Sequence, residues 1–121
     1  MNLDRKEKNC ISLLDSSYRH DLNVVKIHSS NKELHELAKT RVCYFLKKNN
    51  RKFITEAILK DRVGRIDIYD ITWDIAYEIV NTETEKEKEQ KLKVYPIGKI
   101  VFLNAKEIME CKELYLFKYL N

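Results

Sequence analysis

The chain has 121 residues, of which 44% are hydrophobic and 35% are charged, and its net charge at pH 7 is +4. This length suits a single domain with one core, and the apolar content excludes an intrinsically disordered chain. No apolar run approaches the ~18 residues of a membrane-spanning helix, so no membrane partner is expected, while the mild positive charge permits a nucleic-acid partner without requiring one.

The first 29 residues form an extension whose pattern is hard to interpret. The sequence predicts a short helix over residues 10–17 and an extended segment over residues 22–28. From residue 30 onward the apolar spacing becomes regular, and few glycines or prolines interrupt it. We therefore expect one domain over residues 30–121, preceded by an extension over residues 1–29.

A long helix is predicted directly after this extension. Ser30 and Glu33 have the spacing of a capping box, in which each side chain binds the backbone of the other residue. Apolar residues then recur at helical intervals as far as Leu46 and form one stripe. We expect the helix to end at Asn49 and Asn50, after two lysines that suit its C-terminal dipole.

Three strands are predicted next, at residues 53–59, 65–70 and 75–80, with turns at residues 60–64 and 71–74. Strict alternation along the first strand places Phe53, Thr55, Ala57 and Leu59 on one side and Ile54, Glu56 and Ile58 on the other. Each strand also carries an acidic residue among its apolar neighbours, although acids are depleted in strands.

The rest of the chain supplies a helix, a strand and a final helix. Thr82 and Glu85 form a second capping box, for a helix that ends near Tyr95. Residues 99–104 are the fourth predicted strand, and Asn104 caps the final helix. Its apolar side is expected to contain Ile108, Cys111, Tyr115 and Tyr119. From residue 30 the order is therefore α-β-β-β-α-β with one more helix, which predicts a mixed α/β fold.

The three strand acids are Glu56, Asp67 and Glu78, and both intervals between them are 11 residues (67 − 56 and 78 − 67). Residues that face each other in an antiparallel hairpin have numbers with a constant sum. A turn centred between residues 61 and 62 pairs Glu56 with Asp67, and a turn centred between residues 72 and 73 pairs Asp67 with Glu78. The spacing thus predicts three carboxylates in a row on one face of the sheet.

Such a row needs a partner, because opposed like charges destabilise a sheet. A divalent cation fits, since Mg²⁺ takes oxygen ligands and is often held by one or two carboxylates together with substrate phosphates. Lys91 or Lys93 of the following helix would stabilise developing negative charge, and His35, Lys39 and Arg65 would contact nucleic acid. The alternative is a solvated face, on which the acids pair with Lys or Arg and the lysine-rich helix is merely exposed.

These features resemble the PD-(D/E)XK, or restriction-endonuclease-like, nuclease superfamily, whose core has the order αβββαβ and whose acidic pair comes from the second and third strands. Residues 30–104 also resemble a group of small archaeal and viral proteins. The matching positions are His35, Lys39, Glu56, Gly64, Arg65, Asp67, Glu78, Glu83, Lys91 or Lys93, and Tyr95-Pro96. The third strand of the superfamily ends in Glu-x-Lys, whereas this chain has Val80 at the lysine position.

The resemblance implies a metal-dependent endonuclease that hydrolyses phosphodiester bonds in DNA or RNA, with DNA as the first expectation. Asp67, Glu78 and Glu56 would hold Mg²⁺ or Mn²⁺, and Lys91 or Lys93 would supply the missing lysine. Because Val80 stands at that position, the alternative is a catalytically inactive module of the same fold that binds nucleic acid or a protein partner.

Two further expectations concern the compartment and self-association. The chain has three widely spaced cysteines, an odd number that argues against a disulfide framework, and its first residues lack a signal-peptide core, so a cytoplasmic location is expected. Apolar residues crowd together at 114–120, which predicts a homodimer through the last helix. A dimeric structural protein whose acids are all exposed is the third alternative.

Overall fold

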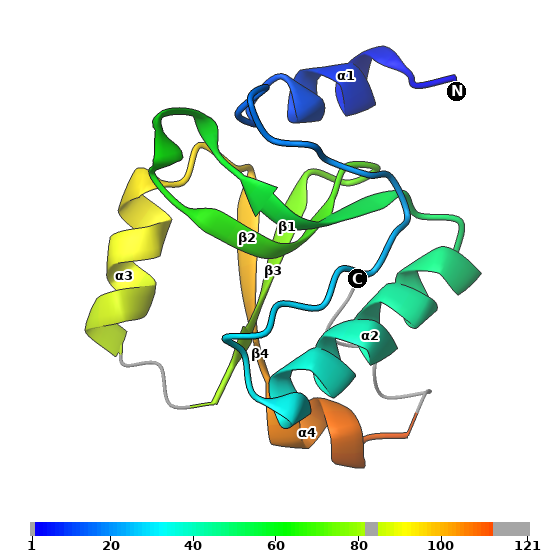
Figure 1. The fold of residues 1–121 in the computed structure, drawn as a ribbon, viewed down its shortest axis with the longest axis vertical. Helices are drawn as coiled ribbons and strands as arrows, with labels where there is room; N and C mark the ends of the chain where they lie inside the picture. The colour runs from blue at the N-terminus through cyan, green and yellow to red at the C-terminus, as the bar shows by residue number, and fades with distance from the viewer. Residues whose placement is uncertain (1, 82–84, 113–121) are drawn as a thin grey trace.

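The fold centres on a four-stranded mixed sheet with the strand order β1-β2-β3-β4 (Figure 1). A computed structural model describes residues 2–81 and 85–112 of the chain. The strands are β1 (Phe53–Ile58), β2 (Arg65–Asp70), β3 (Ile75–Val80) and β4 (Lys99–Asn104). The first three are antiparallel, and β4 is parallel to β3 after a crossover through α3 (Glu85–Val94). The predicted α/β class and the order α-β-β-β-α-β from residue 30 are confirmed.

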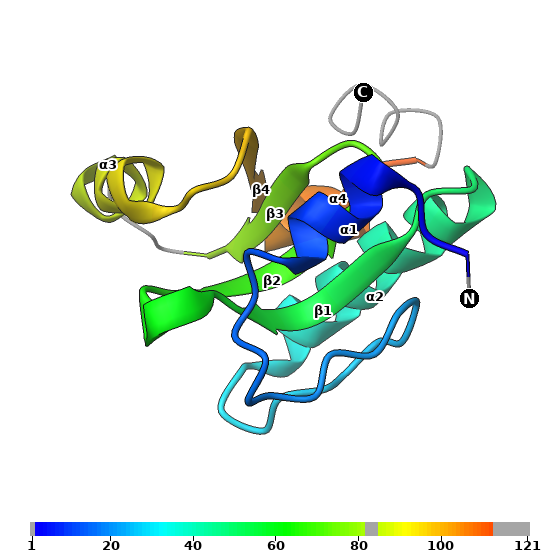
Figure 2. The same cartoon turned by 90° about the horizontal axis from the view of Figure 1, so that it is seen from above.

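Helices cover both faces of this sheet, with α1 (Arg5–Ile11) above it and α2 (Glu33–Lys48) and α4 (Ala105–Glu110) below it in Figure 1. The core on the α2 side includes Ala38, Val42, Leu46, Ile68, Tyr77 and Leu103. The core on the α1 side includes Cys10, Leu14, Ile54, Ile66, Tyr69 and Ala76. In both views α3 lies to one side of the sheet, so one face of α3 remains open to solvent (Figure 2).

The N-terminal extension packs on the same sheet as the rest of the chain. Leu14 forms an isolated bridge with Leu59, and Leu22 forms one with Ile54. The helix predicted over residues 10–17 was placed wrongly, because α1 ends at Ile11. It begins earlier because the Asp4 carboxylate accepts from the backbone of Glu7, and the Glu7 carboxylate accepts from the backbone of Asp4.

The ends of the other helices agree only partly with the predictions. The Ser30 capping box does not form; α2 begins after Lys32, which makes no side-chain cap, and Ser30 bonds to the ring of His28 instead. Asn49 ends α2 as predicted, and the Asn104 carboxamide oxygen accepts from the backbone of Glu107 at 3.0 Å. The second capping box and the predicted apolar residues Tyr115 and Tyr119 lie outside the described residues. No helix in the described ranges is long and apolar enough to cross a membrane.

An ion pair holds the turn between β2 and β3 onto the core. Arg51 and Asp70 are both buried, with Arg51 Nε 2.7 Å from Asp70 Oδ2. Arg51 also donates to the Tyr77 hydroxyl at 2.9 Å and lies over the Trp73 ring. The other oxygen of Asp70 accepts from the backbone of Thr72 and Trp73. One carboxylate therefore organises both the turn and the start of β1.

Replacing Asp70 with asparagine should lower the free energy of unfolding by about 3–5 kcal/mol, because the buried Arg51 guanidinium would lose its counter-charge. Urea unfolding checks this. Asp61→Asn, in the exposed turn at 60–62, is the matched control and should change stability by less than about 0.5 kcal/mol. A loss in Asp70→Asn no larger than in this control would contradict a structural role for the ion pair.

Candidate active site

The strand register brings the three acids into neighbouring positions, as their spacing predicted. Thr55 pairs with Ile68 and Ala57 with Ile66, so Glu56 lies across from Asp67, and the pairing sum is 123 (55 + 68 and 57 + 66). Between β2 and β3, Ile68 pairs with Tyr77, which gives the predicted sum of 145 (68 + 77). Both predicted registers are confirmed.

The alternation predicted for the first strand fails at Glu56. Its backbone has a φ of 51°, in the left-handed region that non-glycine residues adopt infrequently. As a result Phe53 belongs to the core on the α2 side, whereas Ala57 and Leu59 join Ile54 in the core on the α1 side. The irregular backbone directs the carboxylate of Glu56 toward α2, where Lys39 binds it.

Where β2 and β3 stop pairing, two side-chain carboxylates accept the hydrogen bonds that backbone carbonyls accept elsewhere between these strands. The Asp67 backbone N–H donates to Glu78 Oε2 at 3.2 Å, and the Ile79 backbone N–H donates to Asp67 Oδ2 at 2.8 Å. The paired residues of these strands run only from Asp70–Ile75 to Ile68–Tyr77. Each carboxylate thus accepts a hydrogen bond from the backbone of the neighbouring strand, and these bonds keep both carboxylates at this end of the sheet.

The predicted single row on one face is divided between two helices. Glu56 and Asp67 contact residues of α2, whereas Glu78 faces Lys91 of α3. Alternation accounts for Glu78, because its neighbours Tyr77 and Ile79 fill the core on the α2 side. It does not account for Asp67, where β2 is irregular: Ile66 and Ile68 belong to the cores on opposite sides of the sheet. Asp67 and Glu78 remain linked through the backbone of Asp67.

A buried lysine connects the α2 side of the site. The Lys39 side chain is 0% exposed, and its ammonium lies 2.6 Å from Glu36 Oε2 and 2.8 Å from Glu56 Oε1. It also donates to the backbone carbonyl of Lys26. None of the Lys39 side chain reaches the surface in this structure, and its predicted contact with nucleic acid stays a prediction.

His35 continues this network to the strand acids. Its Nδ1 lies 3.1 Å from Glu36 Oε1, and its Nε2 lies 3.3 Å from Asp67 Oδ2. Glu36 was missed from the sequence, although its position beside His35 and three residues before Lys39 is the signal that would have identified it. His35 is positioned here to orient Asp67, and its predicted contact with nucleic acid stays a prediction.

Arg65 is the member of this network that is exposed to solvent, and it contacts Glu56. Its Nε lies 2.8 Å from Glu56 Oε2, an ion-pair contact that lacks hydrogen-bond geometry, and about a third of its side chain is exposed. Of the three cationic residues predicted to bind nucleic acid, Arg65 is the most exposed, and its role toward a polymer stays a prediction.

The acid pair has pKa values that are pushed apart. Burial, together with the charge of Asp67, raises the pKa of Glu78 to about 8. Burial opposes ionisation of Asp67 as well, but its hydrogen bond to His35, the charge of that ring and the Ile79 N–H outweigh it and lower the pKa of Asp67. The same hydrogen bond raises the pKa of His35. Burial and the neighbouring charge therefore favour the protonated form of Glu78, whereas the hydrogen bonds of Asp67 favour its charged form.

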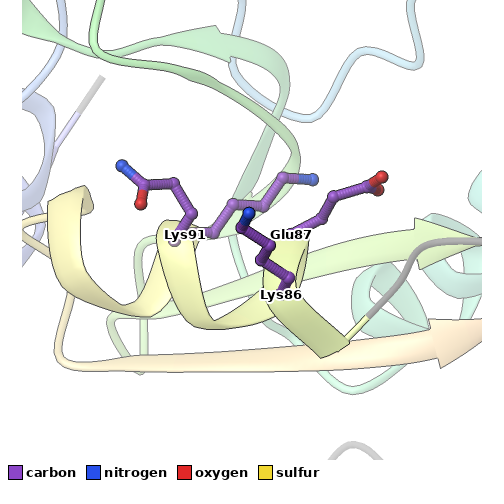
Figure 3. Close-up of a pocket in the computed structure, with 4 residues that line it drawn as sticks. Lys86, Glu87 and Lys91 are labelled. Atoms are coloured by element: carbon purple, nitrogen blue, oxygen red, sulfur yellow. The ribbon is translucent and has the colours of Figure 1, made fainter.

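Lys91 is the lysine that the structure brings to the acids. Its Nζ lies 3.7 Å from Glu78 Oε1, whereas Lys93 is exposed on α3. Lys91 also lines a hollow on α3 together with Lys86, Glu87 and Gln90, and Figure 3 shows these side chains standing on one side of the helix. The sequence left open whether Lys91 or Lys93 approaches the acids. In the structure Lys91 is the one that lies near Glu78.

The motif residues Gly64 and Tyr95 position α3 relative to the sheet. A Cβ at Gly64 would lie 2.3 Å from the Tyr95 ring, so only glycine leaves room for this side chain. The Tyr95 hydroxyl donates to the backbone carbonyl of Arg65 at 3.3 Å. This contact holds the end of α3 against the start of β2, on the side from which Lys91 reaches Glu78.

Of the three predicted metal ligands, Asp67 and Glu78 are the two that are linked to each other in the structure. Within residues 2–81 and 85–112, no three His, Cys, Asp or Glu side chains converge closely enough to hold a metal ion. Glu56 is bound to Lys39 and Arg65, which argues against it as a ligand. Asp67 and Glu78 provide oxygen donors of the type that Mg²⁺ and Mn²⁺ prefer. Glu83 of the motif lies outside the described residues.

Comparison with known proteins gives no relative whose site could be set beside this one. No family model matches the sequence, and neither a curated protein nor a solved structure matches it. The contacts described above are therefore the basis for any functional proposal.

Replacing Lys39 with methionine should lower the free energy of unfolding by about 3–5 kcal/mol, because Glu36 and Glu56 would lose their shared counter-charge. Urea unfolding of the variant measures this. Lys47→Met, on an exposed position of the same helix, is the matched control and should change stability by less than about 0.5 kcal/mol. Equal effects of the two substitutions would contradict the role of Lys39.

Replacing Asp67 with asparagine should lower the pKa of His35, because the hydrogen bond that raises it is weakened. Titration of the ring protons by NMR measures this, and the pKa of His20, lowered by burial away from the site, is the internal control. Since folding raises the pKa of His35, its contribution to stability is complete below pH 6.5 and is lost as the pH rises through the folded value. An unchanged His35 titration in the variant would rule out the pairing.

Proposed function

We propose that the protein is a Mg²⁺- or Mn²⁺-dependent nuclease that hydrolyses phosphodiester bonds in DNA or RNA. The observation that carries this proposal is the state of Glu78. Its side chain is buried, and Oε1 has no hydrogen-bond partner among the described residues. A buried carboxylate oxygen without a partner is costly, and such costs are retained where a ligand relieves them.

A divalent cation at Asp67 and Glu78 would relieve this cost more completely than the neighbouring lysine does. The Lys91 ammonium is 3.7 Å from Glu78 Oε1, which is an ion-pair distance but too long for a hydrogen bond. Burial and the charge of Asp67 raise the pKa of Glu78, and the attraction of Lys91 does not offset them. Asp67 is already charged and oriented by His35 and the Ile79 N–H.

The chain's own residues would then divide the work of hydrolysis. Asp67 and Glu78 would hold the cation, which when bound supplies Lewis-acid stabilisation and an acidified water. Lys91 would stabilise negative charge on the phosphoryl oxygens, and Glu56 would keep Arg65 at the solvent side, facing the phosphates. The topology supports this assignment, because its order is that of the nuclease superfamily which the sequence resembles.

The second candidate is a non-catalytic module that binds nucleic acid or a protein partner. Val80 favours it, because it stands where the superfamily has a lysine and pairs with Asn104 of β4. Such a module would bind nucleic acid with strong salt dependence and without a need for metal. The nuclease is preferred because a binding surface alone does not require a buried carboxylate oxygen that lacks a hydrogen bond, as Glu78 Oε1 does among the described residues.

Purified protein incubated with single- and double-stranded DNA and RNA should cut at least one substrate when Mg²⁺ or Mn²⁺ is present and none with chelator. Asp67→Asn and Glu78→Gln should each lower the rate at least ~100-fold, because each removes a proposed cation ligand. Lys91→Ala should lower the rate by about 10²–10³-fold through loss of charge stabilisation.

Asp61→Asn and Lys93→Ala, exposed on the surface, are the matched controls and should retain full activity. Full cutting by Asp67→Asn would overturn the proposed site. Metal-independent, salt-sensitive binding without any cutting would favour the binding module instead.

A further inference from the structure

One aromatic side chain of the sheet, Phe102 of β4, belongs to neither of the two cores. In the parallel ladder it pairs with Glu78 of β3, so the two side chains are neighbours on the same face of the sheet. The preceding pair on this face is Ala76 and Ile100, and both of these residues pack in the core on the α1 side. Among the described residues of β4, this core therefore ends at Ile100, and Phe102 lies beyond it, next to the acid.

Helix α3 turns lysines, and not apolar side chains, toward this pair. The Lys88 ammonium lies 5.6 Å from the centre of the Phe102 ring. Three residues later, the Lys91 ammonium lies 3.7 Å from Glu78 Oε1. Leu92 of the same helix is 55% exposed, whereas a helix that served only to cover a core would turn its leucine inward. This face of α3 therefore suits a ligand that is negatively charged.

The Phe102 ring itself suits a flat, apolar part of the same ligand. Phenylalanine is among the residues most often fully buried, yet this side chain is only partly buried. Neighbouring strands lie ~4.8 Å apart, so the ring is about one strand spacing from Glu78. A nucleotide has both properties, because its phosphate is charged and its base stacks on aromatic rings.

We propose that Phe102 stacks on a nucleobase of the substrate, beside the phosphate that binds at Asp67 and Glu78. The inference rests on the proposed function and adds a substrate class to it. A base inside a duplex is already stacked on its neighbours, so the substrate is single-stranded or unpaired at this point. The base takes the place of the Lys88 ammonium over the ring, and the ammonium moves to the adjoining phosphate. Phe102 is thus a specificity-determining residue.

Binding of single strands with and without bases tests this. The probes are labelled thymidine and uridine strands of ~12 nucleotides, each compared with a strand of the same length that lacks bases, in chelator so that nothing is cut. In fluorescence anisotropy, the full chain should bind at least one base-containing strand ~5-fold or more tightly than its base-free counterpart, because only bases can stack. Phe102→Leu should make the two affinities equal and leave binding of the base-free strand unchanged.

Two further variants and a duplex are the controls. Phe102→Tyr keeps an aromatic ring and should retain the preference. Tyr44→Leu, which removes a 64% exposed aromatic side chain on α2, should also retain it. Binding of a duplex of the same length should be unchanged in Phe102→Leu, because its bases are already stacked. Circular dichroism of Phe102→Leu verifies that this variant is folded.

Failure of this inference can be told apart from failure of the nuclease. Equal affinities of the wild-type chain for strands with and without bases, or a preference that survives Phe102→Leu, would overturn the inference even if the wild-type chain cuts with metal. Weaker duplex binding by Phe102→Leu would overturn the single-stranded substrate class. A preference that Phe102→Leu abolishes, in a chain that cuts nothing with any metal, would overturn the nuclease and leave Phe102 as the stacking residue of a binding module.

Discussion

The separation of β2 and β3 beside two buried carboxylates is the constraint on which the site depends. Where the strands stop pairing, Glu78 accepts from the backbone of Asp67, and Asp67 accepts from the backbone of Ile79. Without these bonds the two N–H groups would need other partners, at a cost of about 1–3 kcal/mol for each that found none. The carboxylates are therefore part of the sheet as well as of the site. Their positions are set by backbone geometry and not by flexible surface rotamers.

The charges of the basic side chains around the acids balance those of the acids when Glu78 is protonated. Lys39, Arg65 and Lys91 face Glu36, Glu56, Asp67 and Glu78. The raised pKa of Glu78 favours its protonated form, and in that form three cations face three anions. Added positive charge beside Glu78 would favour release of its proton. In the proposed nuclease, a bound cation would therefore bring the acid pair to its fully charged state.

Features that depend on spacing could be predicted from the sequence, whereas features that depend on tertiary contacts could not. The 11-residue intervals predicted both registers, because each depends only on where a hairpin turn is centred. They could not reveal the left-handed backbone of Glu56, which is stabilised by Lys39, a residue of another element. Ser30 fails as a cap for a similar reason, since His28 competes for its hydroxyl. Glu36 was overlooked because an acid in the first turn of a helix usually needs no further explanation.

In the proposed nuclease, the lysine that stabilises negative charge would come from a helix and not from the strand. A lysine at position 80 would extend from β3 itself, but Val80 instead pairs with Asn104 in the parallel ladder to β4. Lys91 approaches from α3, whose position is set by the contact between Tyr95 and Gly64. Its ammonium, 3.7 Å from Glu78, is near enough to be attracted by the acid, and it carries three donors of the kind that a phosphoryl oxygen accepts. If the proposed function is right, Lys91 of α3 therefore takes the place of the strand lysine, and it can do so because the contact of Tyr95 with Gly64 holds the end of α3.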